Sequence, residues 1–218
     1  MPYTALVDTE ALAQHFADPD WLIVDCRFDL AQPSWGEAQY RAAHVPGAIY
    51  AHLERDLSGT KTGRNGRHPL PAPQDFEMTL QRWGVEADMQ IVAYDQANGM
   101  WASRLWWLLR HTGHRAVAVL DGGWSRWTRE GFATQAELPL PRSRSSFSVN
   151  WGSAGLVNVD EVDHLRTDGR YCVINARAPE RYRGEVEPID PVAGHIPGAV
   201  NHSPYAAKLT GLSSRSLA

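Results

Sequence analysis

The sequence has 218 residues, 43% hydrophobic and 21% charged, a composition typical of a globular protein with one or two domains. A formal net charge of −4 argues against a surface that binds nucleic acid or an anionic membrane. No apolar run approaches the roughly 18 residues of a membrane helix, no signal peptide is seen, and two cysteines are too few for a disulfide framework, so we predict a cytoplasmic protein.

The first 132 residues alternate between helical and strand patterns. In chain order we expect a helix at 7–16, strands at 21–24 and 49–50, a polar loop at 56–73, a helix at 75–83, a strand at 91–94, a helix at 100–111, a strand at 117–120 and a helix at 124–130. The strands are short apolar runs, which are typical of strands buried on both faces. Because helices separate them, the pattern predicts an α/β fold with a mainly parallel sheet in a domain at 1–132.

The composition changes after this domain. Residues 133–156 are rich in Ser and Pro and are interpreted as a linker, with 147–149 as an extended piece lying on the first domain. Residues 157–218 are interpreted as a second domain, with a helix at 159–165 and a strand at 171–174. After Tyr205 the sequence has no helical or strand period, which indicates a frayed tail.

One stretch of sequence occurs twice. Val24-Asp25-Cys26-Arg27 leads to His44-Val45-Pro46-Gly47-Ala48, and Ile174-Asn175-Ala176-Arg177 leads to His195-Ile196-Pro197-Gly198-Ala199. The offset is 175 − 25 = 150 residues at the strand end and 195 − 44 = 151 at the histidine. The near-constant spacing indicates a duplicated domain.

These motifs resemble those of the tandem-domain rhodaneses, the thiosulfate and 3-mercaptopyruvate sulfurtransferases. The likeness covers residues 4–205 and includes Gly66-Arg67-His68-Pro69-Leu70-Pro71 and Leu120-Asp121-Gly122-Gly123-Trp124. The resemblance implies an enzyme without a cofactor that moves sulfane sulfur from a small anionic donor, thiosulfate or 3-mercaptopyruvate, to cyanide or a thiol. It also implies an N-terminal domain that is usually inactive and a C-terminal domain with a cysteine that becomes a persulfide.

A persulfide-forming thiolate needs a positive concavity, which backbone N–H groups at a helix N-terminus supply. In the first copy the strand at 91–94 leads to Asp95 where the resemblance implies the nucleophile, and residues 95–102 contain no thiol. Counting 95 − 44 = 51 residues from His195 leads to position 246, beyond Ala218. We therefore expect a truncated second domain without a catalytic residue, an inactive chain, and self-association through the incomplete domain.

The remaining candidates have structural alternatives. By resemblance, Arg177 and Arg181 bind the anionic donor; the alternative is surface arginines paired with glutamates of the same segment, Glu180, Glu185 and Glu187. Cys26 and Cys172 are interpreted as structural residues, with Cys172 inside a buried strand. His44 and His195 are interpreted as turn-fixing residues. The pair His111 and His114 lacks a third ligand, so no metal site is predicted.

A second class of function stays open at this point. An inactive rhodanese domain can be kept as a non-catalytic binding module for a partner protein, and the sequence does not separate this reading from the enzymatic one.

Overall fold

The computed structural model describes residues 1–152 and 155–203. The chain divides into two compact units, Met1–Ala154 (unit 1) and Gly155–Ala218 (unit 2), which are described separately. Among the described residues, no helix has the length and apolar character needed to cross a membrane.

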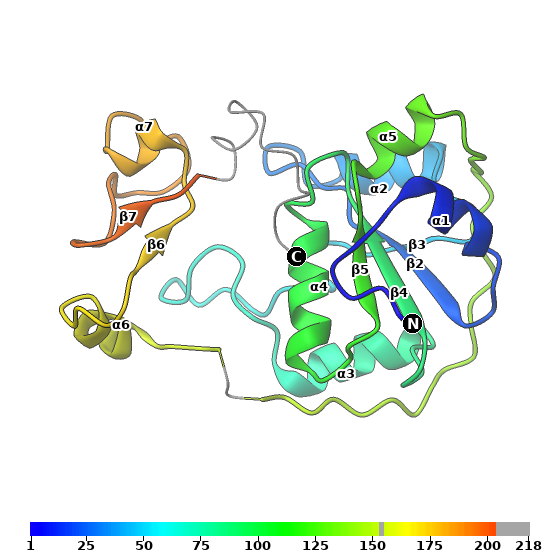
Figure 1. Cartoon of the computed structure of the whole chain (residues 1–218), viewed down its shortest axis with the longest axis horizontal. Helices are drawn as coiled ribbons and strands as arrows, with labels where there is room; N and C mark the ends of the chain where they lie inside the picture. The colour runs from blue at the N-terminus through cyan, green and yellow to red at the C-terminus, as the bar shows by residue number, and fades with distance from the viewer. Residues whose placement is uncertain (153–154, 204–218) are drawn as a thin grey trace. The chain divides into compact units, whose positions relative to one another are not determined.

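Unit 1 is built on a five-stranded parallel sheet with the order β1-β5-β4-β2-β3 (Figure 1). Its strands are β1 (Leu6–Val7), β2 (Trp21–Asp25), β3 (Ile49–Tyr50), β4 (Gln90–Tyr94) and β5 (Val117–Leu120). Every pair of neighbouring strands is parallel, so the predicted α/β class is confirmed.

Five helices accompany the sheet: α1 (Thr9–His15), α2 (Trp35–Ala42), α3 (Pro73–Arg82), α4 (Ala102–His111) and α5 (Gly123–Arg129). The helices α3 and α4 cover one face of the sheet, and α1 and α5 cover the other (Figure 1). Their apolar side chains form one core on each face. Alternate residues of β2 serve the two cores, Leu22 with the first and Ile23 with the second. Burial of both faces explains the continuous apolar runs of the strands.

Two features of unit 1 differ from the sequence prediction. Val7 belongs to a strand rather than to the first helix, because Asp8 accepts a hydrogen bond from Ala11 N (2.7 Å) and so caps a helix that begins at Thr9. The helix α2 was not predicted, since its eight residues present few apolar positions beyond the buried Tyr40.

Residues 141–152, here called the strap, lie in an extended conformation along unit 1. Ser145 N donates to Gln81 O (3.1 Å), and Val149 N donates to the Glu77 carboxylate (2.9 Å). The side chains of Phe147, Val149 and Trp151 pack against the core beneath α3 and α4. These contacts hold the strap to unit 1.

Unit 2 contains α6 (Val159–Leu165), β6 (Ile174–Asn175), α7 (Pro179–Tyr182) and β7 (Val200–Asn201), with β6 and β7 parallel. The predicted strand at 171–174 is wrong in its bounds, and Cys172 is exposed rather than buried in a strand. The reason is that this unit encloses little apolar surface: Ile174 is 61% exposed and Val200 48%. The predicted tail after Tyr205 lies outside the described residues.

Candidate functional site

Asp95 occupies the end of β4, where the loop to α4 begins. Its Oδ1 accepts hydrogen bonds from Ala97 N (3.1 Å) and Gly99 N (3.0 Å), and its Oδ2 from Trp101 N (2.8 Å) and Ala102 N (3.3 Å). The side chain is only 1% exposed. Four amides of one loop therefore converge on a single carboxylate, in the manner of an anion-binding nest at a helix N-terminus.

The backbone of this loop is held against the next loop of the sheet. Trp124 N donates to Asp95 O (2.9 Å), and a Cβ added at Gly123 would lie 2.5 Å from the same oxygen. Only glycine fits at this close approach, in a backbone with φ of +55°. The Gly122-Gly123-Trp124 stretch of the sequence thus helps to position the Asp95 loop.

A buried polar network lies at the same edge of the sheet. Arg27 donates to both oxygens of Asp25, and Tyr94 Oη donates to Asp25 Oδ2 (2.7 Å). The Arg27 guanidinium also lies 4.4 Å from the Trp124 ring and donates to Ala43 O (2.6 Å). Since Nε and Nη2 of Arg27 both donate to protein groups and the side chain is 1% exposed, the network ties loops together rather than presenting a cation to a ligand.

In unit 2 two arginines share two carboxylates. Arg181 donates to Glu187 (2.7 Å) and to Asp190 Oδ2 (3.0 Å), and Arg177 Nη2 donates to the same Asp190 oxygen (3.2 Å). Hydrogen bonds from Arg181 lower the pKa of Glu187 to about 2. Of the expected partners, only Glu187 pairs with these arginines among the described residues, and Asp190 is a second partner that the sequence pattern did not indicate.

Several contacts of unit 1 recur at the repeated motif in unit 2. Arg27 donates to Ala43 O, the carbonyl before His44, and Arg177 donates to Gly194 O (2.9 Å), the carbonyl before His195. Asp25 accepts from the amide two residues later at 2.9 Å, and Asn175 does the same at 2.9 Å.

The two histidines also lie in matching environments. His44 Nδ1 is 2.7 Å from Tyr40 O and its ring stacks on Tyr40. His195 Nδ1 is 2.7 Å from Tyr182 O and its ring stacks on Tyr182. Each tyrosine hydroxyl in turn donates to the alanine carbonyl that follows the Pro-Gly turn, Ala48 or Ala199. Both histidines therefore help to hold these turns.

Comparison with known proteins gives the family. The family model of the rhodanese-like domain matches residues 8–130, which is more than half of the chain. The chain belongs to the rhodanese family. The matched range contains strands β2, β3, β4 and β5 of the sheet in unit 1, together with the Asp95 loop, and it begins just after β1.

Curated relatives and solved structures agree with this rhodanese assignment. A Pseudomonas aeruginosa protein named "Probable 3-mercaptopyruvate sulfurtransferase" is 43% identical over 91% of this chain, which spans 70% of that protein. The 3-mercaptopyruvate sulfurtransferase of Escherichia coli is 31% identical over 92% of this chain and 72% of its own. The structure of 3-mercaptopyruvate sulfurtransferase from Leishmania major superposes with a TM-score of 0.81 at 30% identity, over 92% of this chain and 54% of that one. Since these relatives are named as sulfurtransferases, family resemblance identifies this rhodanese as an enzyme.

Neither cysteine of this rhodanese lies in an amide nest. Burial raises the pKa of Cys26 well above its ordinary value, and the carboxylates of Asp25, Asp95 and Asp56 raise it further. A buried thiol with a raised pKa is a poor nucleophile. Cys172, contrary to expectation, is exposed.

The loop before α3 is held in place by Arg104, a residue that the sequence analysis did not single out. Arg104 of α4 donates to Leu57 O (2.9 Å), His68 O (3.1 Å) and Pro69 O (2.9 Å), so it holds the Gly66–Pro71 motif of this rhodanese against α4. Burial lowers the pKa of His68, whose Nε2 lies 3.5 Å from Glu54. In the sequence, only the Gly66–Pro71 motif pointed to this loop.

Among the described residues, no group of three His, Cys, Asp or Glu side chains is placed to hold a metal ion. His111 stacks on Trp107 with ring centroids 4.7 Å apart, and His114 Nε2 lies 2.9 Å from Met89 O. The two histidines are thus engaged separately, His111 in ring stacking and His114 in a hydrogen bond.

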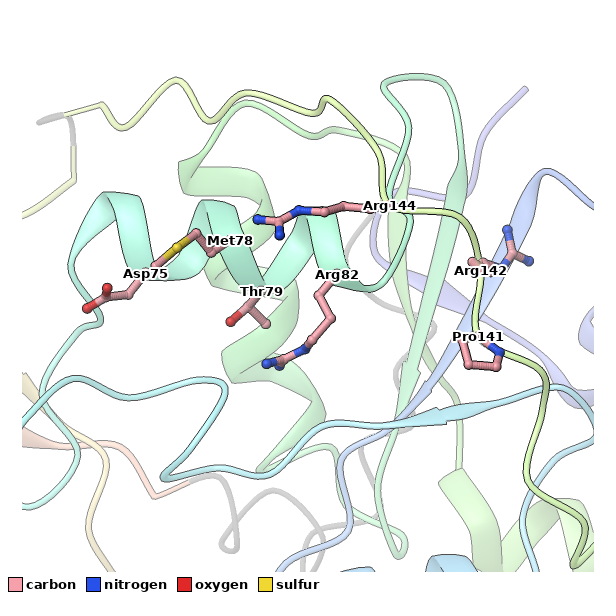
Figure 2. Close-up of a pocket in the computed structure, with 7 residues that line it drawn as sticks. All are labelled: Asp75, Met78, Thr79, Arg82, Pro141, Arg142 and Arg144. Atoms are coloured by element: carbon pink, nitrogen blue, oxygen red, sulfur yellow. The ribbon is translucent and has the colours of Figure 1, made fainter.

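A groove of about 500 Å³ lies between α3 and the strap (Figure 2). It is lined by Asp75, Met78, Thr79, Arg82, Pro141, Arg142 and Arg144. Figure 2 shows the guanidinium group of Arg142 pointing away from those of Arg82 and Arg144. Arg82 donates to Asp56 (2.6 Å), Arg142 to Trp21 O (2.7 Å) and Arg144 to Gln81 (3.2 Å). The arginines therefore fasten neighbouring segments and do not converge on one anion.

Proposed function

We propose that this rhodanese is of the type that moves sulfur from thiosulfate or 3-mercaptopyruvate to a thiol or cyanide, that Arg177 and Arg181 bind the sulfur donor, and that the chain itself does not complete the transfer. The relatives named as 3-mercaptopyruvate sulfurtransferases support the reaction class. The observation that carries the proposal is the shared Asp190 oxygen, within 3.2 Å of a guanidinium nitrogen of each arginine. Two guanidinium groups that meet at one oxygen form a site for an oxyanion.

The chemistry assigns different roles to the two copies. A cysteine thiolate attacks the outer sulfur of thiosulfate, the S–S bond breaks, and sulfite leaves with the electron pair; the persulfide then passes its outer sulfur to the acceptor. Asp95 has a carboxylate where this reaction needs a thiol, so it cannot form a persulfide. This carboxylate fills the amide nest of the first copy. We infer that the first copy is non-catalytic and that neither Cys26 nor Cys172 of the 218-residue chain forms a persulfide.

We also propose that the chain is a tandem repeat. Residues 1–132 form a rhodanese-like domain, 133–156 a linker, and 157–218 a second copy of the same motif in a tandem repeat, located in the cytoplasm. The recurring arginine and histidine contacts support the repeat. Exposed apolar side chains on unit 2, among them Ile174, Val192 and Val200, favour self-association through this unit.

Thiosulfate titration of the chain tests the donor site. We expect binding that weakens about tenfold in Arg181→Lys, since lysine keeps the charge but loses the planar fork. Arg170→Lys is the matched control because Arg170 is exposed and pairs with Asp168 outside the site. An affinity that does not depend on Arg181 contradicts the proposal.

Intact-mass measurement after thiosulfate treatment tests the role of the cysteines. We expect no addition of about 32 Da, the mass of one sulfur atom, to either cysteine, and no thiocyanate formation on addition of cyanide. A stable adduct on Cys172, lost in Cys172→Ser, overturns this part of the proposal.

A non-catalytic binding module is the second candidate. The observation that favours it is the filled nest at Asp95, which leaves unit 1 without the family's chemistry. A protein partner that binds equally well to the wild type and to Arg181→Lys supports the module.

A further inference from the structure

The donor-binding pair proposed above is already neutralised within unit 2. Arg177 and Arg181 bring two positive charges, and Glu187 and Asp190 bring two negative ones, all linked by contacts of 3.5 Å or less. The formal charges of these four side chains cancel, so an incoming anion meets two arginines whose charge is already balanced by two carboxylates. It gains the full attraction of the arginines only if a carboxylate withdraws.

The two carboxylates are held very differently. Glu187 Oε1 accepts from Arg181 and also from the backbone amides of Ile189 (3.1 Å) and Asp190 (2.9 Å), and the Glu187 side chain is 6% exposed. Asp190 is 33% exposed. Moving Glu187 would break its hydrogen bonds to the backbone amides of Ile189 and Asp190, whereas the Asp190 side chain is the more exposed of the two carboxylates.

Asp190 also lies where a bound donor anion would contact both arginines. Its Oδ2 is the atom that contacts both arginines, at 3.0 Å from Arg181 and 3.2 Å from Arg177. Arg181 is meanwhile oriented by Glu187 through its Nε as well as its Nη2. The Asp190 carboxylate thus takes the place of one oxygen of a bound oxyanion.

We propose that Asp190 is a displaceable internal carboxylate that competes with the anionic sulfur donor for Arg177 and Arg181, while Glu187 is a positioning residue that keeps Arg181 in place. The inference rests on the donor site proposed above. It assigns to Asp190 a role in donor affinity: the carboxylate lowers the affinity for every small oxyanion, and a donor must form two strong guanidinium contacts to replace it.

The test is thiosulfate titration by calorimetry at one fixed ionic strength. We expect Asp190→Asn to bind about tenfold more tightly than the wild type, because the competing charge is gone while the side-chain size is kept. Glu185→Gln is the matched control: it removes the same charge from the same segment, but Glu185 pairs with Arg183. We expect the control to bind as the wild type does.

Asp190→Ser provides a second variant in case the asparagine alters folding, and circular dichroism checks each protein. The pair Glu187→Gln and Asp190→Asn separates the two roles: we expect Glu187→Gln to weaken binding because Arg181 loses its fixed orientation.

The outcomes distinguish the two proposals. If thiosulfate binding depends on Arg181 but Asp190→Asn, Asp190→Ser and the wild type have equal affinity, the role of Asp190 is wrong and the donor site stands. If neither the wild type nor the Asp190 variants bind thiosulfate, or if Arg181→Lys leaves binding by Asp190→Asn unchanged, the donor site itself is wrong.

Discussion

Arg27 Nη2 lies 2.6 Å from Asp25 Oδ2, and both side chains are almost completely removed from solvent. The pair closes the carboxyl edge of the sheet between β2 and β4, since Tyr94 of β4 donates to the same Asp25 oxygen. When one member of a buried ion pair is removed, the remaining charge is stabilised neither by its counter-ion nor by water. Removal of either residue is therefore expected to destabilise the fold.

Substitution Arg27→Met is therefore expected to lower the free energy of unfolding of unit 1 by about 3–5 kcal/mol, because it leaves the Asp25 carboxylate buried without its counter-ion. Urea unfolding followed by tryptophan fluorescence measures the loss. Arg41→Met is the control, since Arg41 is 60% exposed and pairs with Glu37 at the surface, and it should cost no more than about 1 kcal/mol. Equal losses in the two variants would show that burial of the Arg27 pair is not what matters.

Replacing Asp95 by Asn should also destabilise unit 1. An amide NH₂ group would face two of the four backbone donors that now meet carboxylate oxygens, and an unsatisfied buried donor costs about 1–3 kcal/mol. Asp29→Asn is the control because Asp29 accepts two backbone N–H groups in an exposed turn. Thermal unfolding of the three proteins compares the costs; a loss in Asp29→Asn as large as in Asp95→Asn contradicts the account of the nest.

The two cysteines should differ in their reaction with iodoacetamide. Cys172 is exposed and is expected to be alkylated in the folded chain, whereas Cys26 is buried with a raised pKa and should react only after unfolding in urea. Peptide mass mapping identifies the modified residue. The variant Cys172→Ser should take up no label while folded, and labelling of Cys26 in that variant would contradict the burial argument.

His114 should make the stability of unit 1 depend on pH. Burial lowers the pKa of His114 below 6.5. The unfolded chain therefore binds a proton at pH values where the folded chain does not. The contribution of His114 to the free energy of unfolding is fully present above pH 6.5 and is lost as the pH falls toward the lowered pKa. Unfolding measured from pH 8 to pH 5 should decline less steeply in His114→Gln than in the wild type. Parallel curves for the two proteins would exclude this contribution.

Much of unit 1 could be read from local patterns. The strands at 21–24, 91–94 and 117–120 were predicted because continuous apolar runs mark strands buried on both faces, and the structure has strands there. The strand β1 was missed because its two residues become a strand only through β5, whose Val119 N donates to Ala5 O (2.9 Å). The residues next to Leu6 and Val7 in the sequence do not include this partner, which lies far along the chain.

The sequence by itself determined that the chain is a rhodanese-type α/β protein, that Asp95 follows a central strand, and that two arginines lie in the repeated motif, because each of these depends on residues close together in the chain. Only the tertiary structure decided that four amides converge on Asp95 and that Asp190, rather than Glu180 or Glu185, shares an oxygen between Arg177 and Arg181. The physical reason is that such contacts depend on where turns and loops bring the chain back on itself, to within a hydrogen-bond length, and the identity of the residues alone does not specify that path.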